Sequence, residues 1–391
     1  MLRIGVDNVS TGESTSKAAP GGMRMYLKAL ISEFLRQNNG LTVVLFTPAW
    51  ADPLFEIEPQ GLEVVRLRDV PINKFARILF QQTTLASAIN SHRIDAFFAT
   101  ATILPLLVTA PAVVAIQFIQ FYSMPDTYGW FRTRYLRFML PLSIRRSFRS
   151  IIFTSASKLD LLNYTGVPAA KISVIPHGLS KEVIDAARAP QEARGKGLVL
   201  TGGSPYLLYV SATYGYKNHL RLIRAFSLLK KRMRCQHKLL LVGAESGVTY
   251  DQLRVEAVAH GVGDSVVIAG RVQSAALLYH DAELAVIPTL YETFGYPPLE
   301  AMACGCPVAA SNCGSISELC DGAAELFDPM DESAIAMSVE KVISDRDYRS
   351  TLILRGKAVS ARFTWESSAR ATLSLLEQAA EERNANPVSK S

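Results

Sequence analysis

Short apolar segments alternate with helical stretches in two successive series along the chain. In the first half, strand-like segments occur at 2–6, 41–46, 62–67, 95–99, 112–116 and 150–154, and helical patterns cover 22–37, 75–91, 128–149 and 157–164. Largely apolar strands separated by helices are typical of parallel sheets that helices cover on both faces. The first half is therefore predicted to form a doubly wound α/β domain.

The alternation restarts after residue 204. Strand-like segments lie at 206–212, 238–244, 265–270, 284–288 and 307–311, and helical patterns cover 218–233, 250–260, 274–281 and 298–304. The segment 184–203 is rich in Ala, Gly and charge, which is typical of a linker. We therefore expect an N-terminal Rossmann-like domain at 1–183 and a C-terminal Rossmann-like domain at 204–364. A last helix within 365–391 is expected to join back to the first domain.

Composition agrees with a folded protein of this kind. The chain has 391 residues, of which 49% are hydrophobic and 19% charged, and this excludes a disordered or fibrous protein. The N-terminal "MLRIGVD" resembles a buried strand and not a targeting signal, so we expect a cytoplasmic protein. Four of the five cysteines lie between Cys304 and Cys320, a distribution unlike a secreted disulfide framework, which predicts free thiols.

Basic residues are concentrated in one segment of the first half. Between Thr127 and Leu159 there are seven Arg and Lys residues, several aromatic residues and no acid. A helix of this composition at 130–149 can lie peripherally on an anionic membrane surface, or it can pack its apolar stripe inward and expose its arginines to water. Nucleic acid is not an expected partner, because no recognition motif accompanies the charge.

The segment 96–125 has no charged residue and is long enough to cross a bilayer. Three prolines interrupt it, however, and its two apolar runs resemble short buried strands. We therefore expect two strands and a loop in place of a transmembrane helix.

Ligands bind open parallel sheets at the carboxyl ends of the strands. After the first strand, a polar loop leads to Gly21 and Gly22, which open a helix. Glycines at this place permit close approach of the backbone, and N–H groups at a helix start favour phosphate. The pair is also compatible with a plain turn, and the usual dinucleotide and P-loop signatures are absent.

A second candidate segment runs from Tyr209 to Phe226. A strand leads into a glycine turn, Lys217 lies where a helix begins, and Asn218 is a candidate N-cap. A lysine at this end of a strand can reach a phosphate group as a point charge. It can equally be a solvated surface lysine.

The third candidate segment is "YETFGYPPLEAMACGCPV" at 291–308. Glu292 and Gly295 lie in a loop after a strand, two prolines pre-set the first helical turn, and Glu300 follows near the helix start. Two carboxylates with different neighbours can accept hydrogen bonds from different parts of one ligand. Alternatively, Glu300 is a first-turn acid that complements the helix dipole.

This last segment resembles the retaining GT-B glycosyltransferases of the family 4 type, whose mark is two Glu separated by seven residues. The resemblance extends to "GG" at Gly21, "TSASKLDLL" at Thr154, "VIPHG" at Val174, "YKNH" at Tyr216, "LVGA" at Leu241 and "FTWESSA" at Phe363. It implies two Rossmann-like domains that face a central cleft. It also implies transfer of a sugar from a nucleoside diphosphate donor with retention at the anomeric carbon, without a cofactor or an obligatory metal.

The resemblance also implies roles for individual residues. Lys217 would hold the diphosphate and assist catalysis, Glu300 the ribose, and Glu292 the reacting sugar. The remaining expected donor contacts are Gly21, Gly22, Arg271, Val272, Phe294, Gly295 and Tyr296, and the expected acceptor-side residues are Gln117 and His177. His177 is also compatible with a structural role. Two departures stand out. Relatives often carry an arginine near Lys217, whereas here Tyr216 precedes it and no arginine follows until Arg221, and relatives often carry a histidine where Gln117 stands.

The resemblance of "YKNH" to mannosyltransferases favours GDP-mannose as donor, and a UDP-sugar is the alternative. We expect a glycan or lipid-linked glycan as acceptor, in polysaccharide or glycoconjugate biosynthesis. A phosphorylase, an epimerase or a nucleotide-sugar-binding protein without turnover are the rival functions. No metal site is predicted, because the cysteines lack C-x₂-C spacing and the Asp-Arg-Asp triplet at 345–347 lies between helical stretches.

Overall fold

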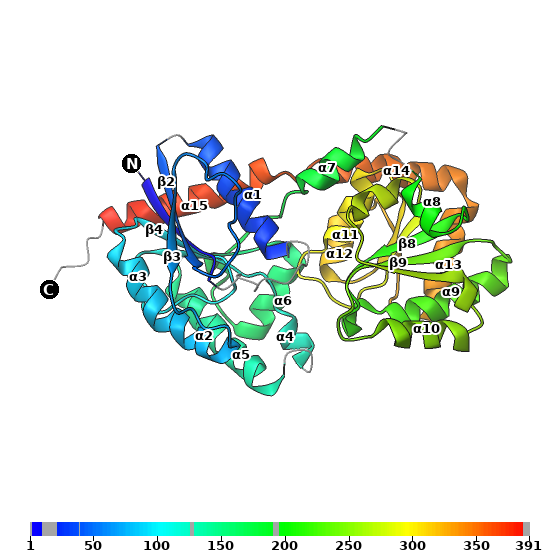
Figure 1. Cartoon of the computed structure of the whole chain (residues 1–391), viewed down its shortest axis with the longest axis horizontal. Coiled ribbons are helices and arrows are strands. Elements are labelled where there is room, and N and C mark those ends of the chain that lie inside the picture. The colour runs from blue at the N-terminus through cyan, green and yellow to red at the C-terminus, as the bar shows by residue number, and fades with distance from the viewer. Residues whose placement is uncertain (1, 10–21, 39, 126–128, 191–194, 386–391) are drawn as a thin grey trace. The chain divides into compact units, whose positions relative to one another are not determined.

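The structure is a computed structural model that describes residues 2–9, 22–38, 40–125, 129–190 and 195–385. The chain divides into two units, which are coloured in sequence order in Figure 1. Unit 1 contains residues 1–178 and 364–391, and unit 2 contains residues 179–363. Each unit has one parallel β-sheet with helices, which confirms the predicted α/β fold class.

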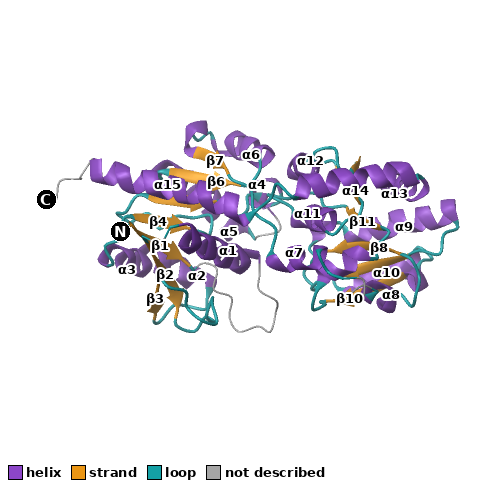
Figure 2. Cartoon of the chain, turned by 90° about the horizontal axis from the view of Figure 1, so that it is seen from above, coloured by secondary structure: helices purple, strands orange, loops and turns teal. Residues whose placement is uncertain are grey.

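Unit 1 is built on a seven-stranded sheet with the strand order β3-β2-β1-β4-β5-β6-β7. Figure 2 labels these strands except β5 and shows β3 and β7 at opposite edges of the sheet. The strands are β1 (Leu2–Asp7), β2 (Leu41–Pro48), β3 (Leu62–Leu67), β4 (Ala96–Ala99), β5 (Ala112–Ala115), β6 (Arg149–Ile152) and β7 (Ile172–Val174). All neighbouring pairs are parallel. The first six were predicted, whereas β7 was not, because three residues are too short for a recognisable pattern.

The main helices of unit 1 are α1 (Gly22–Gln37), α2 (Lys74–Phe80), the π-helical segment η1 (Gln81–Leu85), α3 (Ala86–Ser91), α4 (Gln120–Ser123), α5 (Trp130–Arg146), α6 (Ser155–Thr165) and α15 (Trp365–Ala385). The C-terminal helix α15, red in Figure 1, contacts α1 and β4, so the end of the chain belongs to unit 1. The uncharged segment 96–125 forms β4, β5, α4 and loops, which confirms the two expected strands. Within the described ranges, no helix has the length and apolar character needed to cross a membrane.

Unit 2 has a six-stranded parallel sheet with the order β10-β9-β8-β11-β12-β13. Its strands are β8 (Tyr206–Val210), β9 (Lys238–Val242), β10 (Val266–Gly270), β11 (Leu284–Ile287), β12 (Val308–Ser311) and β13 (Glu325–Phe327). The central strands are buried along their whole length or nearly so, as expected for strands with helices on both faces. The order reverses between β8 and β11, which is the type of place where α/β sheets bind ligands.

The main helices of unit 2 are α7 (Lys181–Ala187), α8 (Lys196–Leu200), α9 (His219–Met233), α10 (Tyr250–Ala259), α11 (Tyr296–Ala303), α12 (Gly314–Cys320), α13 (Glu332–Ser344) and α14 (Arg346–Ser360), with the 3₁₀ segments η5 (Gly215–Lys217) and η7 (Ala275–His280). The stretch 184–203, predicted as a linker, contains α8 and the end of α7. Because α7 contacts η7 and α11, and α8 contacts η7, this stretch belongs to unit 2, which begins at Leu179. Residues 191–194 lie outside the described ranges.

Candidate functional site

The predicted donor-binding residues of unit 2 follow the carboxyl ends of three strands. Lys217 comes after β8, Arg271 and Val272 come directly after β10, and the segment 292–296 comes after β11. Because all strands of this sheet are parallel, these loops emerge at the same end of the sheet, the one formed by the carboxyl ends of the strands. This end is called the carboxyl edge below.

Lys217 and Glu292 form an ion pair at this edge. The ammonium group of Lys217 donates to Oε1 of Glu292, and the two side chains are only 14% and 12% exposed. Burial is the largest single influence and opposes the charge of Lys217, but the carboxylate of Glu292 together with the side chains of Tyr209 and Tyr214 outweighs it, so the pKa of Lys217 is raised. The hydroxyl of Tyr209 donates to the backbone oxygen of Lys217 at 3.0 Å and holds the turn in place. The interpretation of Lys217 as a solvated surface lysine is therefore excluded.

The loops that carry this pair are tied together by their backbones. The amide of Leu290 donates to the oxygen of Tyr216 at 2.8 Å. Asn218 adopts the left-handed conformation, with φ 64°, at the N-cap of α9. The sequence predicted that its side chain caps the helix, but the side chain makes no capping hydrogen bond. It donates instead to the backbone oxygens of Pro288 and Pro329 at 3.0 and 2.8 Å. These bonds fix the loop after β11 beside the loop after β8.

Gly295 is the N-cap residue of α11 and lies against Glu292. Its φ of 109° is a conformation that side-chain-bearing residues rarely adopt, and a Cβ atom there would lie 2.6 Å from Cδ1 of Ile316 and 3.6 Å from Cγ of Glu292. Pro297 and Pro298 follow in the first turn and have no N–H group. Among the N-cap residue and the first three residues of α11, only Gly295 and Tyr296 therefore have backbone N–H donors.

Glu300 is the fifth residue of α11, which has no acid in its first turn. The alternative that Glu300 complements the helix dipole therefore loses its support, since that effect is confined to the first turn. The side chain is half-buried. Burial, and then the negative charge of Glu182 on α7, raises the pKa of Glu300 to about 7.

We expect the stability of the protein to fall as pH rises from about 4.5 to about 7, because folded Glu300 retains a proton that the unfolded chain releases. The loss amounts to about 2 to 3 kcal/mol, since the side chain keeps some contact with solvent. Urea unfolding at pH 5, 6, 7 and 8 measures it. Glu300→Gln is expected to flatten this part of the profile, whereas Glu381→Gln, at an exposed position on α15, should leave it unchanged. An identical slope in wild type and Glu300→Gln would contradict the assignment.

Arg271 and Val272 occupy a different part of the same edge. Two strand spacings, about 10 Å, separate the ends of β10 and β8 in the order β10-β9-β8. Arg271 is exposed and Val272 is half-buried. Arg271 and Lys217 therefore follow strands that are not neighbours in the sheet.

The predicted residues of unit 1 have contrasting environments. Gly21 lies outside the described residues, and Gly22 is the exposed first residue of α1. Gln117 follows β5, and its backbone amide donates to Oγ1 of Thr102 at 3.1 Å. The side-chain nitrogen of Gln117 is buried without a hydrogen-bond partner among the described residues. Gln117 therefore has an amide that a ligand could satisfy.

His177 is packed as a core aromatic residue. It is 4% exposed, and its ring centroid lies 3.8 Å from that of Phe153 and 4.8 Å from that of Tyr26. Burial lowers the pKa of His177 to about 3, so the ring is neutral at physiological pH. These surroundings favour the structural interpretation of His177 over a role as acid or base.

Three supporting residues of the site were not predicted. Tyr209 is a buried strand residue, Ile316 lies on α12 next to Gly295, and Glu182 belongs to the stretch before the second series of strands. The hydrophobic pattern marks Tyr209 and Ile316 as core residues but not as neighbours of the site. No local signal connects Glu182 with a residue 118 positions later.

The cysteines are free thiols, as predicted. Cys304, Cys306 and Cys320 are buried, and burial raises the pKa of Cys304 to about 12, so this thiol is unreactive at neutral pH. In the part of the chain that the structure describes, no group of three or more His, Cys, Asp or Glu side chains is arranged to hold a metal ion.

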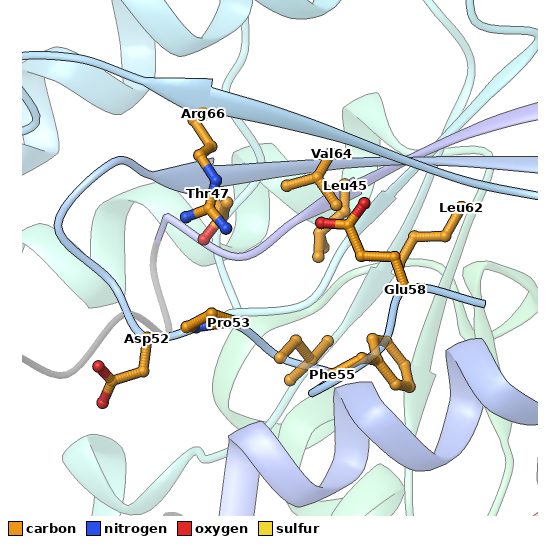
Figure 3. Close-up of a pocket in the computed structure, with 10 residues that line it drawn as sticks. Leu45, Thr47, Asp52, Pro53, Phe55, Glu58, Leu62, Val64 and Arg66 are labelled. Carbon is orange, nitrogen blue, oxygen red and sulfur yellow. The ribbon is translucent and has the colours of Figure 1, made fainter.

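A small cavity in unit 1 lies between one face of β2 and β3 and the segment 52–58 (Figure 3). Side chains of Leu45, Thr47 and Arg66 point into it from the strands, and Phe55 and Glu58 close the other side. Its volume of about 10 Å³ suits a single water molecule. This cavity is too small for a sugar or a nucleotide.

Two family models match the chain in succession. Residues 20–183 match Glycosyltransferase Family 4, and residues 191–359 match Glycosyl transferases group 1. The O-antigen chain mannosyltransferase B of Escherichia coli is 28% identical over 269 residues, which cover 67% of this chain and 69% of that relative. Seven further curated relatives align over 25% to 62% of their own lengths.

Solved structures share the fold over nearly the whole chain. Sucrose-phosphate synthase from Thermosynechococcus elongatus has a TM-score of 0.80 at 21% identity and covers 98% of this chain and 100% of its own. HepE from Anabaena, solved with UDP and glucose, has a TM-score of 0.72 at 18% identity and covers 99% and 100%. Together with the two parallel sheets, these matches define a two-domain GT-B glycosyltransferase fold.

The two family models identify the family within this fold. It belongs to the GT-B glycosyltransferases of the family 4 type and is a glycosyltransferase.

Proposed function

We propose that this enzyme transfers a hexose from a nucleoside diphosphate sugar to a glycan or lipid-linked glycan, with retention at the anomeric carbon. The observation that carries the proposal is the buried ion pair of Lys217 and Glu292, packed against Gly295 at the start of α11. A cation, a carboxylate and a helix start at one place suit a reaction in which negative charge develops on a leaving diphosphate.

In this proposal the bond between the anomeric carbon and the diphosphate oxygen breaks, and both of its electrons remain on the diphosphate. The acceptor hydroxyl forms the new bond on the same face of the sugar and passes its proton to the departing phosphate oxygen. Lys217 and the N–H groups of Gly295 and Tyr296 would stabilise the leaving group. Because two prolines remove donors from this helix start, most of the charge stabilisation falls to Lys217.

Glu292 has two roles in this scheme, one before and one after the donor binds. Its carboxylate partners Lys217 before the donor arrives, which keeps the ammonium group charged in a site shielded from water. When a diphosphate takes over Lys217, the carboxylate is released toward the sugar. Glu292 can then accept a sugar hydroxyl and favour the positive charge that develops at the anomeric carbon. Glu300 would accept the ribose hydroxyls.

GDP-mannose is the proposed donor, and a UDP-sugar is the alternative. The E. coli relative that aligns over 67% of this chain is named a mannosyltransferase, which supports the first choice. No cofactor is required in this scheme, because Lys217 supplies the positive charge at the leaving group.

The test is a panel assay. Purified protein is incubated with GDP-, UDP-, ADP- and dTDP-sugars and glycan acceptors, and release of nucleoside diphosphate is measured. We expect acceptor-dependent release, and we expect Glu292→Gln to lower it by about 100-fold or more while nucleotide binding persists. A product without acceptor would favour an epimerase, dependence on inorganic phosphate a phosphorylase, and tight nucleotide binding without any turnover a binding protein. Any of these three results would overturn the proposal.

We further propose that α5 rests peripherally on an anionic membrane, where a lipid-linked acceptor would lie on the cytoplasmic side. The helix buries Leu136, Leu140 and Ile144, and it exposes Trp130 and Phe138 by 72% and 67%. Arg134 and Arg145 are exposed, and neither makes an ion pair with an acid among the described residues. Exposed aromatic rings and arginines on one helix favour the interface of an anionic bilayer.

Sedimentation with vesicles tests this surface. We expect binding to vesicles with 30% phosphatidylglycerol and not to pure phosphatidylcholine, with about a tenfold loss in the double variant Arg134→Glu, Arg145→Glu. Arg370→Glu on α15 removes an exposed arginine elsewhere in unit 1 and should bind as wild type. Equal loss in both variants, or equal binding to the two kinds of vesicle, would contradict the proposed surface.

A further inference from the structure

A cavity of about 540 Å³ lies in unit 2 between α7 and η7. It is lined on one side by Lys181, Glu182, Asp185, Ala186 and Ala189, and on the other by Ser274 and Leu277. The volume lies in the usual range of small-molecule sites.

The cavity adjoins the proposed donor site. Ser274 ends the short segment that Arg271 and Val272 begin after β10, so the cavity borders the carboxyl edge of the sheet. Glu182 lies close enough to Glu300 for its charge to act on that carboxyl group, and α7 contacts α11. If the ribose meets Glu300, as the proposed function requires, the base attached to that ribose can enter this cavity.

The lining has the two properties that a purine needs. Ala186, Ala189 and Leu277 offer an apolar surface on which a flat ring can lie. Asp185 already pairs with Lys181, at 2.5 Å between Oδ2 and Nζ. Glu182 has no hydrogen bond or ion pair with another described residue, so its carboxylate can accept from a ligand.

The bases differ in what they offer to a carboxylate. Guanine presents two donors side by side, N1–H and the 2-amino group, which match the two oxygens of a carboxylate. Uracil presents one N–H flanked by two carbonyl oxygens, which a carboxylate repels. Adenine presents one amino group beside an acceptor nitrogen. A carboxylate in a base pocket therefore discriminates in favour of guanine.

We propose that the cavity between α7 and η7 binds the nucleobase of the donor and that Glu182 selects guanine. The test measures binding of GDP, inosine diphosphate, UDP and ADP by calorimetry, because inosine diphosphate lacks only the 2-amino group of GDP. We expect wild type to bind GDP about tenfold more tightly than inosine diphosphate, and Glu182→Gln to weaken GDP by about 10- to 100-fold. In Glu182→Gln the two nucleotides should bind nearly alike.

Asp185→Asn is the matched control, one helical turn further along α7. Because Asp185 is held by Lys181, this variant should keep the GDP preference of wild type. Equal affinity of wild type for GDP and inosine diphosphate, or an unchanged preference in Glu182→Gln, would overturn the role of Glu182. Tighter binding of UDP or ADP, with transfer from the corresponding sugar, would overturn guanine selection and leave the proposed function standing. Absence of binding and transfer with every nucleotide would overturn both proposals.

Discussion

Replacement of Lys217 by alanine is expected to lower kcat/KM for sugar transfer by about a thousandfold, because a preorganised charge-stabilising group is lost. The side chain is buried at the sheet edge and held charged by Glu292, and the helix start beside it has two prolines in place of N–H donors. Few other groups in unit 2 can therefore compensate for its loss. Steady-state kinetics with the preferred donor measure the effect.

The loss of activity must be separated from loss of folding. Lys217→Ala leaves Glu292 buried without its partner, which is expected to cost about 3 kcal/mol or more of unfolding free energy. The double variant Lys217→Ala, Glu292→Gln removes the unpaired charge and should recover part of this stability without recovering activity. Chemical unfolding and kinetics on the same samples distinguish the two effects.

Lys341 supplies a matched control for Lys217. It also pairs with a glutamate in unit 2, with 2.8 Å between its Nζ and Oε2 of Glu325, but its side chain is half exposed. Lys341→Ala should retain full activity and lose at most about 1 kcal/mol of stability. Activity of Lys217→Ala within threefold of wild type would contradict the assigned role.

The second large effect is expected for Gly295→Ala. A non-glycine residue at φ 109° costs about 1 to 3 kcal/mol, and the new Cβ atom would lie 2.6 Å from Cδ1 of Ile316. The start of α11 must shift to relieve this contact. This segment provides the N–H donors of Gly295 and Tyr296, and Gly295 packs against Glu292. Because misplacement by about 1 Å costs catalysis about 100-fold, we expect a loss of that order in kcat, measured together with the unfolding transition.

Gly322→Ala is the control for backbone conformation alone. Gly322 has φ 72°, and a Cβ atom there would meet nothing within 4 Å. It should lose about 1 kcal/mol of stability and no activity. Adding Ile316→Ala to Gly295→Ala should relieve the steric contact but not the φ strain, and thus restore activity only in part. The same small effect in Gly295→Ala and Gly322→Ala would refute the close-packing explanation.

Several elements were predictable because their signal is local. The strands of unit 2 from β8 to β12 are runs of apolar residues between turns, and the helix at 22–37 has a regular apolar spacing with the predicted bounds. Other elements had weak local signals. The three-residue strands β7 and β13 are too short for periodicity, and α8 lies in a stretch whose composition resembles a linker.

In the candidate site, too, some features were predictable from local sequence and others were not. The spacing of Glu292 and Glu300 predicts a ligand site, but the local pattern started the helix near Pro298 and so placed Glu300 in its first turn. In the structure α11 starts at Tyr296, two residues before Pro298, because Gly295 in its left-handed conformation ends the preceding loop. Likewise, Asn218 occupies the N-cap position, but its amide binds two backbone oxygens from distant loops instead of the helix.

The sequence by itself determined the alternation of strands and helices, the division into two α/β halves and the family, because these depend on neighbouring residues and on motif spacing. Only the tertiary structure decided that Lys217 meets Glu292 across 75 residues, that the charge of Glu182 acts on Glu300, and that His177 is enclosed by aromatic rings. The physical reason is that ionisation and reactivity depend on burial and on charges within a few ångströms. Those neighbours are brought together by the parallel sheet and the packing of its helices, which no local stretch of sequence specifies.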